Sequence, residues 1–269
     1  MLPDNFIGQI TFLLEKYGPD YLYGARLTLI LALVGTFFGC LIGFICGIVQ
    51  TIPLEKNDNP LKKTAVRLAK FFIAIYVEFF RGTPMMAQAG LIYYGLQYAG
   101  YPISVIAAGF FVISINTGAY MAETMRGGIF SVENGQTEAA KAIGMNHIQT
   151  MIFVILPQAI RNIMPQIGNN FIINIKDSSV LSVISTVELM FTARSVSGTY
   201  YTYFQSMVIA CAIYLTMTVI SSRLLRLLEK HIDGADSYDL STTDTLAHTS
   251  GMTSAPDIKE QLRRRRGGL

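Results

Sequence analysis

The amino-acid sequence predicts an all-α membrane protein with about five transmembrane helices. Hydrophobic residues make up 51% of the 269 residues and charged residues only 14%, whereas a soluble globular domain carries about 25% charged residues. Three stretches contain no Asp, Glu, Lys or Arg, namely residues 27–54, 82–122 and 195–222. Each is longer than the about 20 apolar residues with which an α-helix crosses a bilayer. The composition therefore excludes a soluble single domain.

The first predicted span covers residues 21–50, between the acidic Asp20 and the helix-ending Pro53. It begins too far from Met1 and is too long for a cleaved signal peptide, so we expect it to remain in the mature protein. Glycines at every fourth position share one face of this helix: Gly35, Gly39, Gly43 and Gly47. Because another helix backbone can approach closely there, we interpret the face as a packing surface rather than a pore lining.

The second predicted span, residues 71–98, follows a basic, water-facing loop at 51–70 that includes Lys56. Pro84 breaks a helix, so we expect residues 84–98 to cross and the part before them to lie at the interface. Glu78 and Arg81 are one turn apart and can pair, with Arg81 as a headgroup anchor. The polar residues after Pro84 favour packing and interface roles over substrate contact: Gln88, Tyr93, Tyr94 and Gln97.

The third predicted span covers residues 103–122 and ends at the charged Glu123 and Arg126. These two residues are expected to form a structural ion pair. The polar residues 131–146 follow and contain a short helix, 137–143, which Gly144 closes in the left-handed conformation. That helix is far too short to span a bilayer.

The fourth predicted span, residues 151–175, is diluted by two prolines and six polar residues: Arg161, Asn162, Gln166, Asn169, Asn170 and Asn174. Polar groups are tolerated in a membrane when they face a bundle interior or a watery cavity, so we expect this helix to be shielded from lipid and close to the function. The fifth span covers 201–228. The organisation is an N-terminal extracytoplasmic segment (1–20), a transmembrane domain (21–230) and a disordered cytoplasmic tail (231–269) with a basic cluster at 263–266.

The distribution of basic residues predicts the orientation. On the five-span scheme, fifteen Lys and Arg fall in the segments on one side and four on the other. Since cytoplasmic loops are rich in Lys and Arg, we expect the N-terminus outside, the 131–146 loop inside and the C-terminus in the cytoplasm. The protein is expected in the cell membrane.

Enzyme signatures are missing from the sequence. It contains no G-x-x-x-x-G-K phosphate loop and no H-E-x-x-H, and its three histidines are scattered. The three cysteines lie in apolar stretches and resemble small buried hydrophobic residues rather than a metal set or a disulfide framework. We therefore expect no catalytic residues, no metal and no nucleic-acid partner.

Four short motifs, in order along the chain, carry a family resemblance. Residues 137–144 (TEAAKAIG), followed by 154–157 (VILP), resemble the cytoplasmic "EAA" loop in the membrane subunits of ATP-binding-cassette importers. Residues 79–84 (FFRGTP), 118–123 (GAYMAE) with 126–129 (RGGI), and 177–181 (DSSVL) narrow the resemblance to permeases for polar amino acids. The likeness covers about residues 20–230 and implies a fold like that of type I ABC importers.

The resemblance also implies how such a chain works. In the family the EAA helix docks on an ATPase subunit, so we expect Glu138, Ala139, Ala140 and Gly144 to couple ATPase closure to alternating access. It implies two ATPase subunits, an extracytoplasmic amino-acid-binding protein and a second permease subunit, identical or similar. ATP and Mg²⁺ would bind to the ATPase, and this chain would hold no cofactor.

A desolvated amino acid needs compensating charges or hydrogen bonds, which directs attention to polar groups in the third and fourth spans. Candidate substrate-binding residues are Asn116, Tyr120, Asn170, Asn174, Asp177, Ser178 and Ser179. Some of these residues could instead hydrogen-bond one helix to another. Two other functions stay open: a secondary transporter with an ion relay through Glu123, Lys176 and Asp177, and a structural membrane scaffold.

Overall fold

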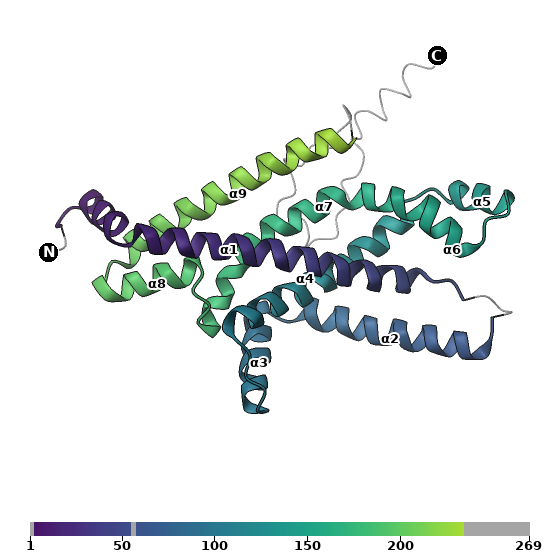
Figure 1. Cartoon of the computed structure of the whole chain (residues 1–269), viewed down its shortest axis with the longest axis horizontal. Coiled ribbons are helices and arrows are strands. Elements are labelled where there is room, and N and C mark those ends of the chain that lie inside the picture. The colour runs from purple at the N-terminus through teal and green to yellow at the C-terminus, as the bar shows by residue number, and fades with distance from the viewer. Residues whose placement is uncertain (1–2, 55–57, 234–269) are drawn as a thin grey trace, which may run out of the picture.

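The computed structural model shows an elongated bundle of helices (Figure 1). It describes residues 3–54 and 58–233, in which every regular element is helical. Lys56 and the tail beyond residue 233, including the 263–266 cluster, lie outside the described residues. The elements are α1 (Phe6–Thr51), α2 (Pro60–Gly82), α3 (Met85–Tyr98), α4 (Val105–Phe130), α5 (Asn134–Ala142), α6 (His147–Thr150), the π-helix η1 (Met151–Ile155), α7 (Leu156–Asp177), the 3₁₀-helix η2 (Ser178–Ile184), α8 (Leu189–Tyr200) and α9 (Tyr203–Asp233).

Helix α1 begins well before the first predicted span. The Asn5 side chain caps it by accepting a hydrogen bond from the backbone N–H of Gly8 at 2.8 Å. The helix then continues through Pro19. Most of the N-terminal segment 1–20 is therefore the first part of α1.

Helices α1 and α4 pack with their backbones in close approach. A Cβ atom added to any of the four α1 glycines would lie 2.3–2.7 Å from an α4 side chain, far inside van der Waals contact. Successive pairs advance by four residues on both helices: Gly35 with Ile113, Gly39 with Thr117, Gly43 with Met121 and Gly47 with Met125. The interpretation as a packing surface is confirmed, and the order of the pairs shows that the two helices run in the same direction.

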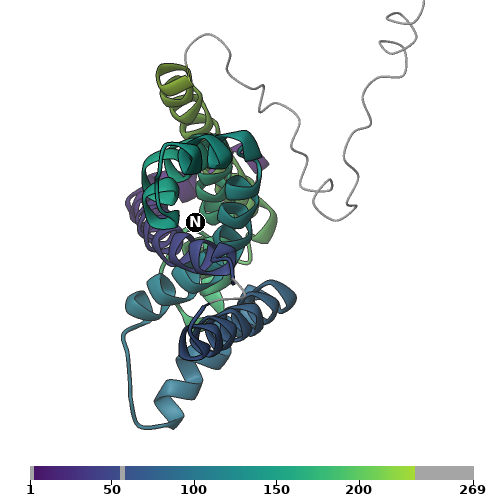
Figure 2. The ribbon, with the colours of Figure 1, turned by 90° about the vertical axis from the view of Figure 1, so that its right-hand side faces the viewer.

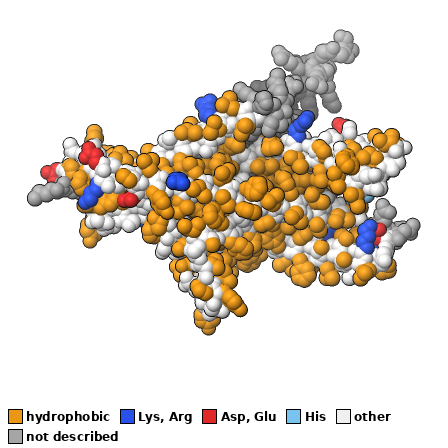
Figure 3. Space-filling view, in the orientation of Figure 1, with side chains coloured by type: hydrophobic (Ala, Val, Ile, Leu, Met, Phe, Trp, Pro, Cys, Tyr) orange, Lys and Arg blue, Asp and Glu red, His pale blue; other side chains and the backbone are white. Residues whose placement is uncertain are grey.

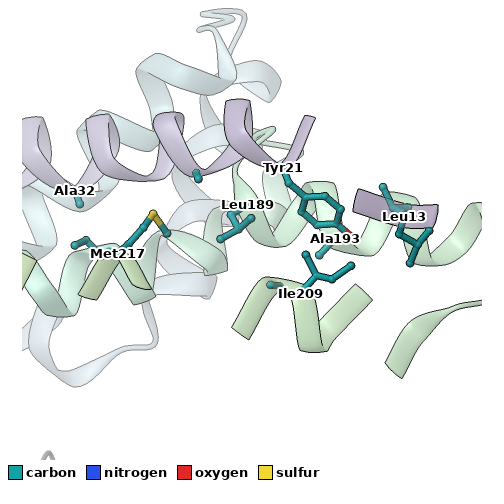
Figure 4. Packing of buried hydrophobic residues seen from close by; sticks show 11 residues of the cluster. Leu13, Tyr21, Ala32, Leu189, Ala193, Ile209 and Met217 are labelled. Atoms are coloured by element: carbon teal, nitrogen blue, oxygen red, sulfur yellow. The ribbon is translucent and has the colours of Figure 1, made fainter. Parts of the chain in front are cut away.

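Three apolar clusters hold the remaining helices. At the end that contains the N-terminus, Tyr21 of α1 points toward Ala193 of α8 and Ile209 of α9 (Figure 4). A second cluster joins α1, α3, α4 and η2, and a third joins α4 to η1 and α7 around Met125 and Ala159. Viewed end on, α2 and α3 lie to one side of the bundle (Figure 2).

The described helices account for the predicted spans in different ways. Helices α1, α4 and α9 are each long and apolar enough to cross a membrane, and residues 147–200 add a fourth candidate if the two parts, bent by 52°, count as one span. Hydrophobic side chains cover the middle of the visible face, as expected for a surface in lipid (Figure 3).

The second predicted span differs most from expectation. The helix does break at Gly82–Pro84, but α3 has only 14 residues, which makes it about 21 Å long. That length is less than the about 30 Å of a bilayer core, and α3 points away from the axis of α1 and α4 (Figure 1). Residues 84–98 cannot cross alone, so any crossing here has to include α2.

The fourth predicted span is a helix that changes its geometry near its start. Pro157 has no N–H to donate to Phe153, and its ring would clash with that carbonyl in a regular α-helix. The chain widens into η1 immediately before it and then continues as α7 through Pro165 to Asp177. A 3₁₀ segment follows and ends at Ser185, whose φ of 63° turns the chain into α8.

Candidate functional site

The break between α2 and α3 exposes backbone carbonyls that two amide side chains satisfy. Pro84 caps α3, and Thr83 is extended. The Gln88 side chain, only 2% exposed, donates from Nε2 to the carbonyls of Phe80 and Thr83, both at 2.9 Å. Asn116 of α4 donates from Nδ2 to the Phe80 carbonyl at 3.1 Å and to Gln88 Oε1 at 2.9 Å. Specific hydrogen bonds thus hold the break between α2 and α3 in a defined geometry, unlike a frayed helix end.

This break lies near the middle of the membrane-crossing part of the bundle. Asn116 sits about half-way along α4 and next to Thr117, which packs on Gly39. The Tyr76 hydroxyl of α2 donates to the Ile115 carbonyl at 2.6 Å and fixes α2 at the same depth. Broken helices at mid-membrane are where transporters place polar binding groups.

A charged cluster extends from the break along α4. The Arg81 Nη1 atom lies 3.7 Å from Glu123 Oε2, and its guanidinium lies over the Tyr120 ring at 5.5 Å. Arg126 Nη2 donates to the same Glu123 oxygen at 2.9 Å. The expected Glu123–Arg126 pair is confirmed. Among the described residues Arg81 does not pair with Glu78 on its own helix but reaches α4.

Asn170 and Asn174 are buried and fully engaged within the bundle. Asn174, 5% exposed, donates to the hydroxyls of Thr36 on α1 at 2.8 Å and Thr117 on α4 at 2.9 Å. Asn170 donates to the Gln166 carbonyl at 3.0 Å and contacts Met121 Sδ at 3.3 Å. These two polar residues of α7 therefore face the bundle interior and connect α7 to its neighbours, whereas Arg161 and Asn162 are exposed.

The remaining substrate-binding candidates, residues 177–179, lie at the end of α7 and differ in burial. Ser178 is fully buried and donates to the Ile175 carbonyl at 2.9 Å. Asp177 is exposed and Ser179 is half-buried. Asp177 lies about one turn beyond Asn174, which is bonded to Thr117. The structure thus places Asp177 on the surface close to the depth of the α2–α3 break.

Helix α5 is a short exposed helix at the opposite end of α7 (Figure 1). Gly144 has a φ of +86° and donates to the Lys141 carbonyl, while Met145 donates to the Ala140 carbonyl, both at 3.0 Å. These two bonds form a Schellman motif, so the expected left-handed cap is confirmed. Glu138 and Ala139 are exposed, whereas Ala140 is only 3% exposed and packs within its own chain.

The loop that carries α5 is joined to α7 by side-chain hydrogen bonds. Asn162 Nδ2 donates to Ser131 Oγ at 2.9 Å. Gln158 Nε2 lies 3.5 Å from Gln136 Oε1 and donates to the Val154 carbonyl at 2.8 Å. These contacts connect the segment around α5 to α7.

The sequence interpretation gave Gln88 a packing and interface role, with which its buried contacts to α2 and α4 agree. It gave Arg81 an anchoring role with Glu78 as a possible partner, whereas Arg81 reaches Glu123 of α4. The α4 partners of these two residues are 28 and 42 positions away along the chain, so local patterns could not identify them. One signal was available: Gln88 lies four residues after a helix-breaking proline, where free carbonyls need donors. In the described part of the chain, no three His, Cys, Asp or Glu side chains gather as a metal site would require.

Comparison with known proteins connects these features. Residues 64–234 match the family described as binding-protein-dependent transport system inner membrane component. The chain is 34% identical over 223 residues to a putative glutamine transport system permease protein of Rickettsia bellii, covering 81% of this chain and 97% of that protein. A probable glutamine ABC transporter permease protein of Bacillus subtilis is 32% identical, with coverage of 80% and 92%.

Solved structures agree with this relationship. A crystal structure of an amino acid ABC transporter with histidines matches with a TM-score of 0.72 and 36% identity, over 85% of this chain and 99% of that chain. An inward-facing methionine transporter, MetNI, shares the fold with a TM-score of 0.61 at 19% identity, over 79% and 98%. The expected all-α fold of the type I importer kind is confirmed. The chain therefore belongs to the family of binding-protein-dependent transport system inner membrane components.

Proposed function

We propose that the chain is the transmembrane permease subunit of an ATP-driven importer of a polar amino acid. The names of its relatives, which include glutamine and amino-acid permeases, support this substrate class. The polar α2–α3 break at mid-membrane offers hydrogen-bonding groups where a zwitterion would lose water. Hydrolysis takes place on two separate ATPase subunits that bind ATP and Mg²⁺, and an extracytoplasmic binding protein delivers the amino acid.

A second permease subunit completes the pathway in this proposal. Val77 is the only buried residue that α2 contributes, and α3 contributes only Gln88 and Ala89. Apolar side chains on both helices are left uncovered, among them Phe72 and Leu91. A homodimer or a pair with a similar subunit would cover this side and enclose the break between two chains.

The observation that carries the coupling mechanism is the connection of α5 to α7. Glu138 and Ala139 are free to enter a groove on the ATPase, while the buried Ala140 and the Gly144 cap hold the helix in its own subunit. Movement of α5 passes through Ser131, Asn162 and the start of α7. It then reaches α1 and α4 through the hydrogen bonds of Asn174.

Within the predicted substrate set, the contacts support two different roles. Asn116, Tyr120, Asp177 and Ser179 lie toward the break or the surface at its depth and form the proposed substrate path. Asn170, Asn174 and Ser178 hold the helices that carry these groups. The Arg81–Glu123 pair offers one charge of each sign, which complements a zwitterion.

Reconstitution tests the proposal directly. The chain should co-purify with an ATPase, and proteoliposomes should accumulate an amino acid only when ATP is supplied and regardless of uncouplers. Uptake that an uncoupler abolishes and ATP does not drive would instead indicate the ion-coupled alternative through Glu123, Lys176 and Asp177. Absence of both ATPase binding and uptake would leave the scaffold interpretation.

A further inference from the structure

A large hollow is lined by the end of α1, the start of α2 and the α6–η1 segment. Its volume is about 710 Å³. Most of its wall is apolar and comes from all three segments: Ile48, Ile52, Val66, Ile148, Met151 and Ile152. The hollow is far from the α2–α3 break, and the function proposed above does not use it.

Polar and charged side chains also line the hollow, namely Asp58, Lys62, Asn146 and His147. Lys62 Nζ lies 2.6 Å from Asp58 Oδ1, yet its side chain is 53% exposed, and an ammonium group has three donors. Lys70 donates to the carbonyl of Ile52 at 2.7 Å and adds a second cation beside the wall.

The apolar wall continues onto side chains that face outward. Ile148 is 67% exposed, and Phe153 of η1 is 70% exposed. Leu61 at the start of α2 is 77% exposed. Such a patch next to a membrane-crossing bundle fits the boundary between hydrocarbon and headgroups, with the charged side chains toward water. In Figure 3 charged side chains gather at this end of the visible face, beside hydrophobic ones.

We propose that this hollow binds one acyl chain of an anionic phospholipid, with the phosphate held at Lys62 and His147. The apolar wall excludes a polar metabolite. Among the described residues beside the hollow, two lysines, Lys62 and Lys70, outnumber the one carboxylate, Asp58, which favours an anionic headgroup over a neutral one. If the 131–146 loop faces the cytoplasm, as the distribution of basic residues predicts, the bound lipid belongs to the inner leaflet. Because α6 and η1 lie between α5 and α7 along the chain, a bound lipid would contact the segment that follows α5.

Photo-crosslinking tests the proposal with the assembled transporter in nanodiscs. The probe is phosphatidylglycerol with a diazirine near the end of one acyl chain, in a background of phosphatidylcholine. Crosslinks should map to the wall around Ile52 and Met151. Val66→Trp should fill the hollow and remove these crosslinks, whereas Leu68→Trp, on α2 but outside the lining, should retain them.

The headgroup is tested separately. Lys62→Gln should lower crosslinking about fivefold, as expected for one basic residue near an anionic lipid, while Arg67→Gln, also outside the lining, should change it little. If Val66→Trp fails to assemble, the Lys62 comparison decides alone. Equal labelling by a phosphatidylcholine probe, or unchanged labelling in Lys62→Gln, would overturn the proposal. Crosslinking requires neither ATP nor substrate, so its outcome is independent of the proposed transport function.

Discussion

Individual polar residues in the bundle differ in what surrounds them, and this difference supports the different roles proposed for them. Asn174 has partners on two other helices, Thr36 and Thr117. Asp177, about one turn later, is exposed. An internal hydrogen bond contributes to stability, and its loss leaves a buried partner unsatisfied. The removal of an exposed carboxylate at the same depth leaves no buried partner without a hydrogen bond.

Replacing Asn174 with Leu should destabilise the protein without changing its affinity for substrate. The change removes the bonds to two buried hydroxyls, which costs about 1–3 kcal/mol, so the thermal unfolding temperature in detergent should fall. For thermal stability alone, Asn162→Leu is the matched control, because Asn162 is exposed and bonds to one exposed serine. Its uptake is not compared, because Asn162 lies on the proposed path from α5 to α7. If the concentration for half-maximal uptake rose in Asn174→Leu while thermal stability stayed the same, Asn174 would contact substrate after all.

Replacing Asp177 with Ala should do the opposite. Removal of a charged hydrogen-bonding partner should raise the amino-acid concentration for half-maximal uptake about tenfold, with thermal stability and ATPase binding unchanged. Asn116→Leu should affect both properties, because Asn116 also satisfies the Phe80 carbonyl. Glu133→Gln serves as the control, since Glu133 is exposed and its side chain makes no cap hydrogen bond. Normal uptake by Asp177→Ala and Asn116→Leu would place the pocket elsewhere.

At the scale of elements, the contact between α1 and α4 depends on the absence of side chains. In Gly43→Ala the new methyl group would lie 2.3 Å from Met121 Cβ, so the helices would have to separate. Overpacking of this kind costs about 1–3 kcal/mol, which should lower the yield of folded protein and its unfolding temperature. In Gly90→Ala, in α3, the added Cβ atom would have no neighbouring atom within 4 Å, so this variant should have no such cost. Equal stability of the two variants would show that the α1–α4 contact is looser than described.

The cap of α5 gives a second test at this scale. In Gly144→Val a β-branched residue would have to adopt a φ of +86°, which is strongly unfavourable. ATP hydrolysis by the complex should then proceed with little uptake, while membrane insertion is retained. Gly135→Ala lies in the same helix without a positive φ and should transport normally. Uptake at the normal ratio to hydrolysis in both Gly144→Val and Glu138→Lys would contradict the coupling role of α5.

For the whole molecule, the proposed orientation predicts which surfaces an impermeant thiol reagent reaches in intact cells. After removal of the three native cysteines, a cysteine at Asn134 should be protected, because α5 faces the cytoplasm in this orientation. A cysteine at Gly198 should react, because a Cβ atom added there would have no neighbouring atom within 4 Å. Tyr98 is 97% exposed and provides a second outer position without the positive φ of Gly100. Labelling of Asn134 from outside would reverse the orientation.

Features encoded by neighbouring residues could be predicted from the sequence, and features that join distant segments could not. The glycine face of α1 and the Gly144 cap each depend on residues within about four turns, so their spacing sufficed. The Arg81–Glu123 pair and the direction of α3 depend on how α2 meets α4, which no local pattern records. For the same reason the sequence could group the polar residues of α7 but could not separate Asp177 from Asn174.

Because α1 and α4 run in the same direction, the number of times that the chain crosses the membrane between them is restricted. Two neighbouring helices that cross in the same direction require an odd number of return crossings between them. Residues 52–104 contain only α2 and α3 as described helices, so these two must together make that return, despite the charges on α2. Helix α7 then runs back and α9 runs forward again, so the end of α9 lies at the opposite end of the bundle from the start of α1 (Figure 1). The hydropathy of α2 and α3 does not reveal the second crossing. The direction in which α1 and α4 run reveals it.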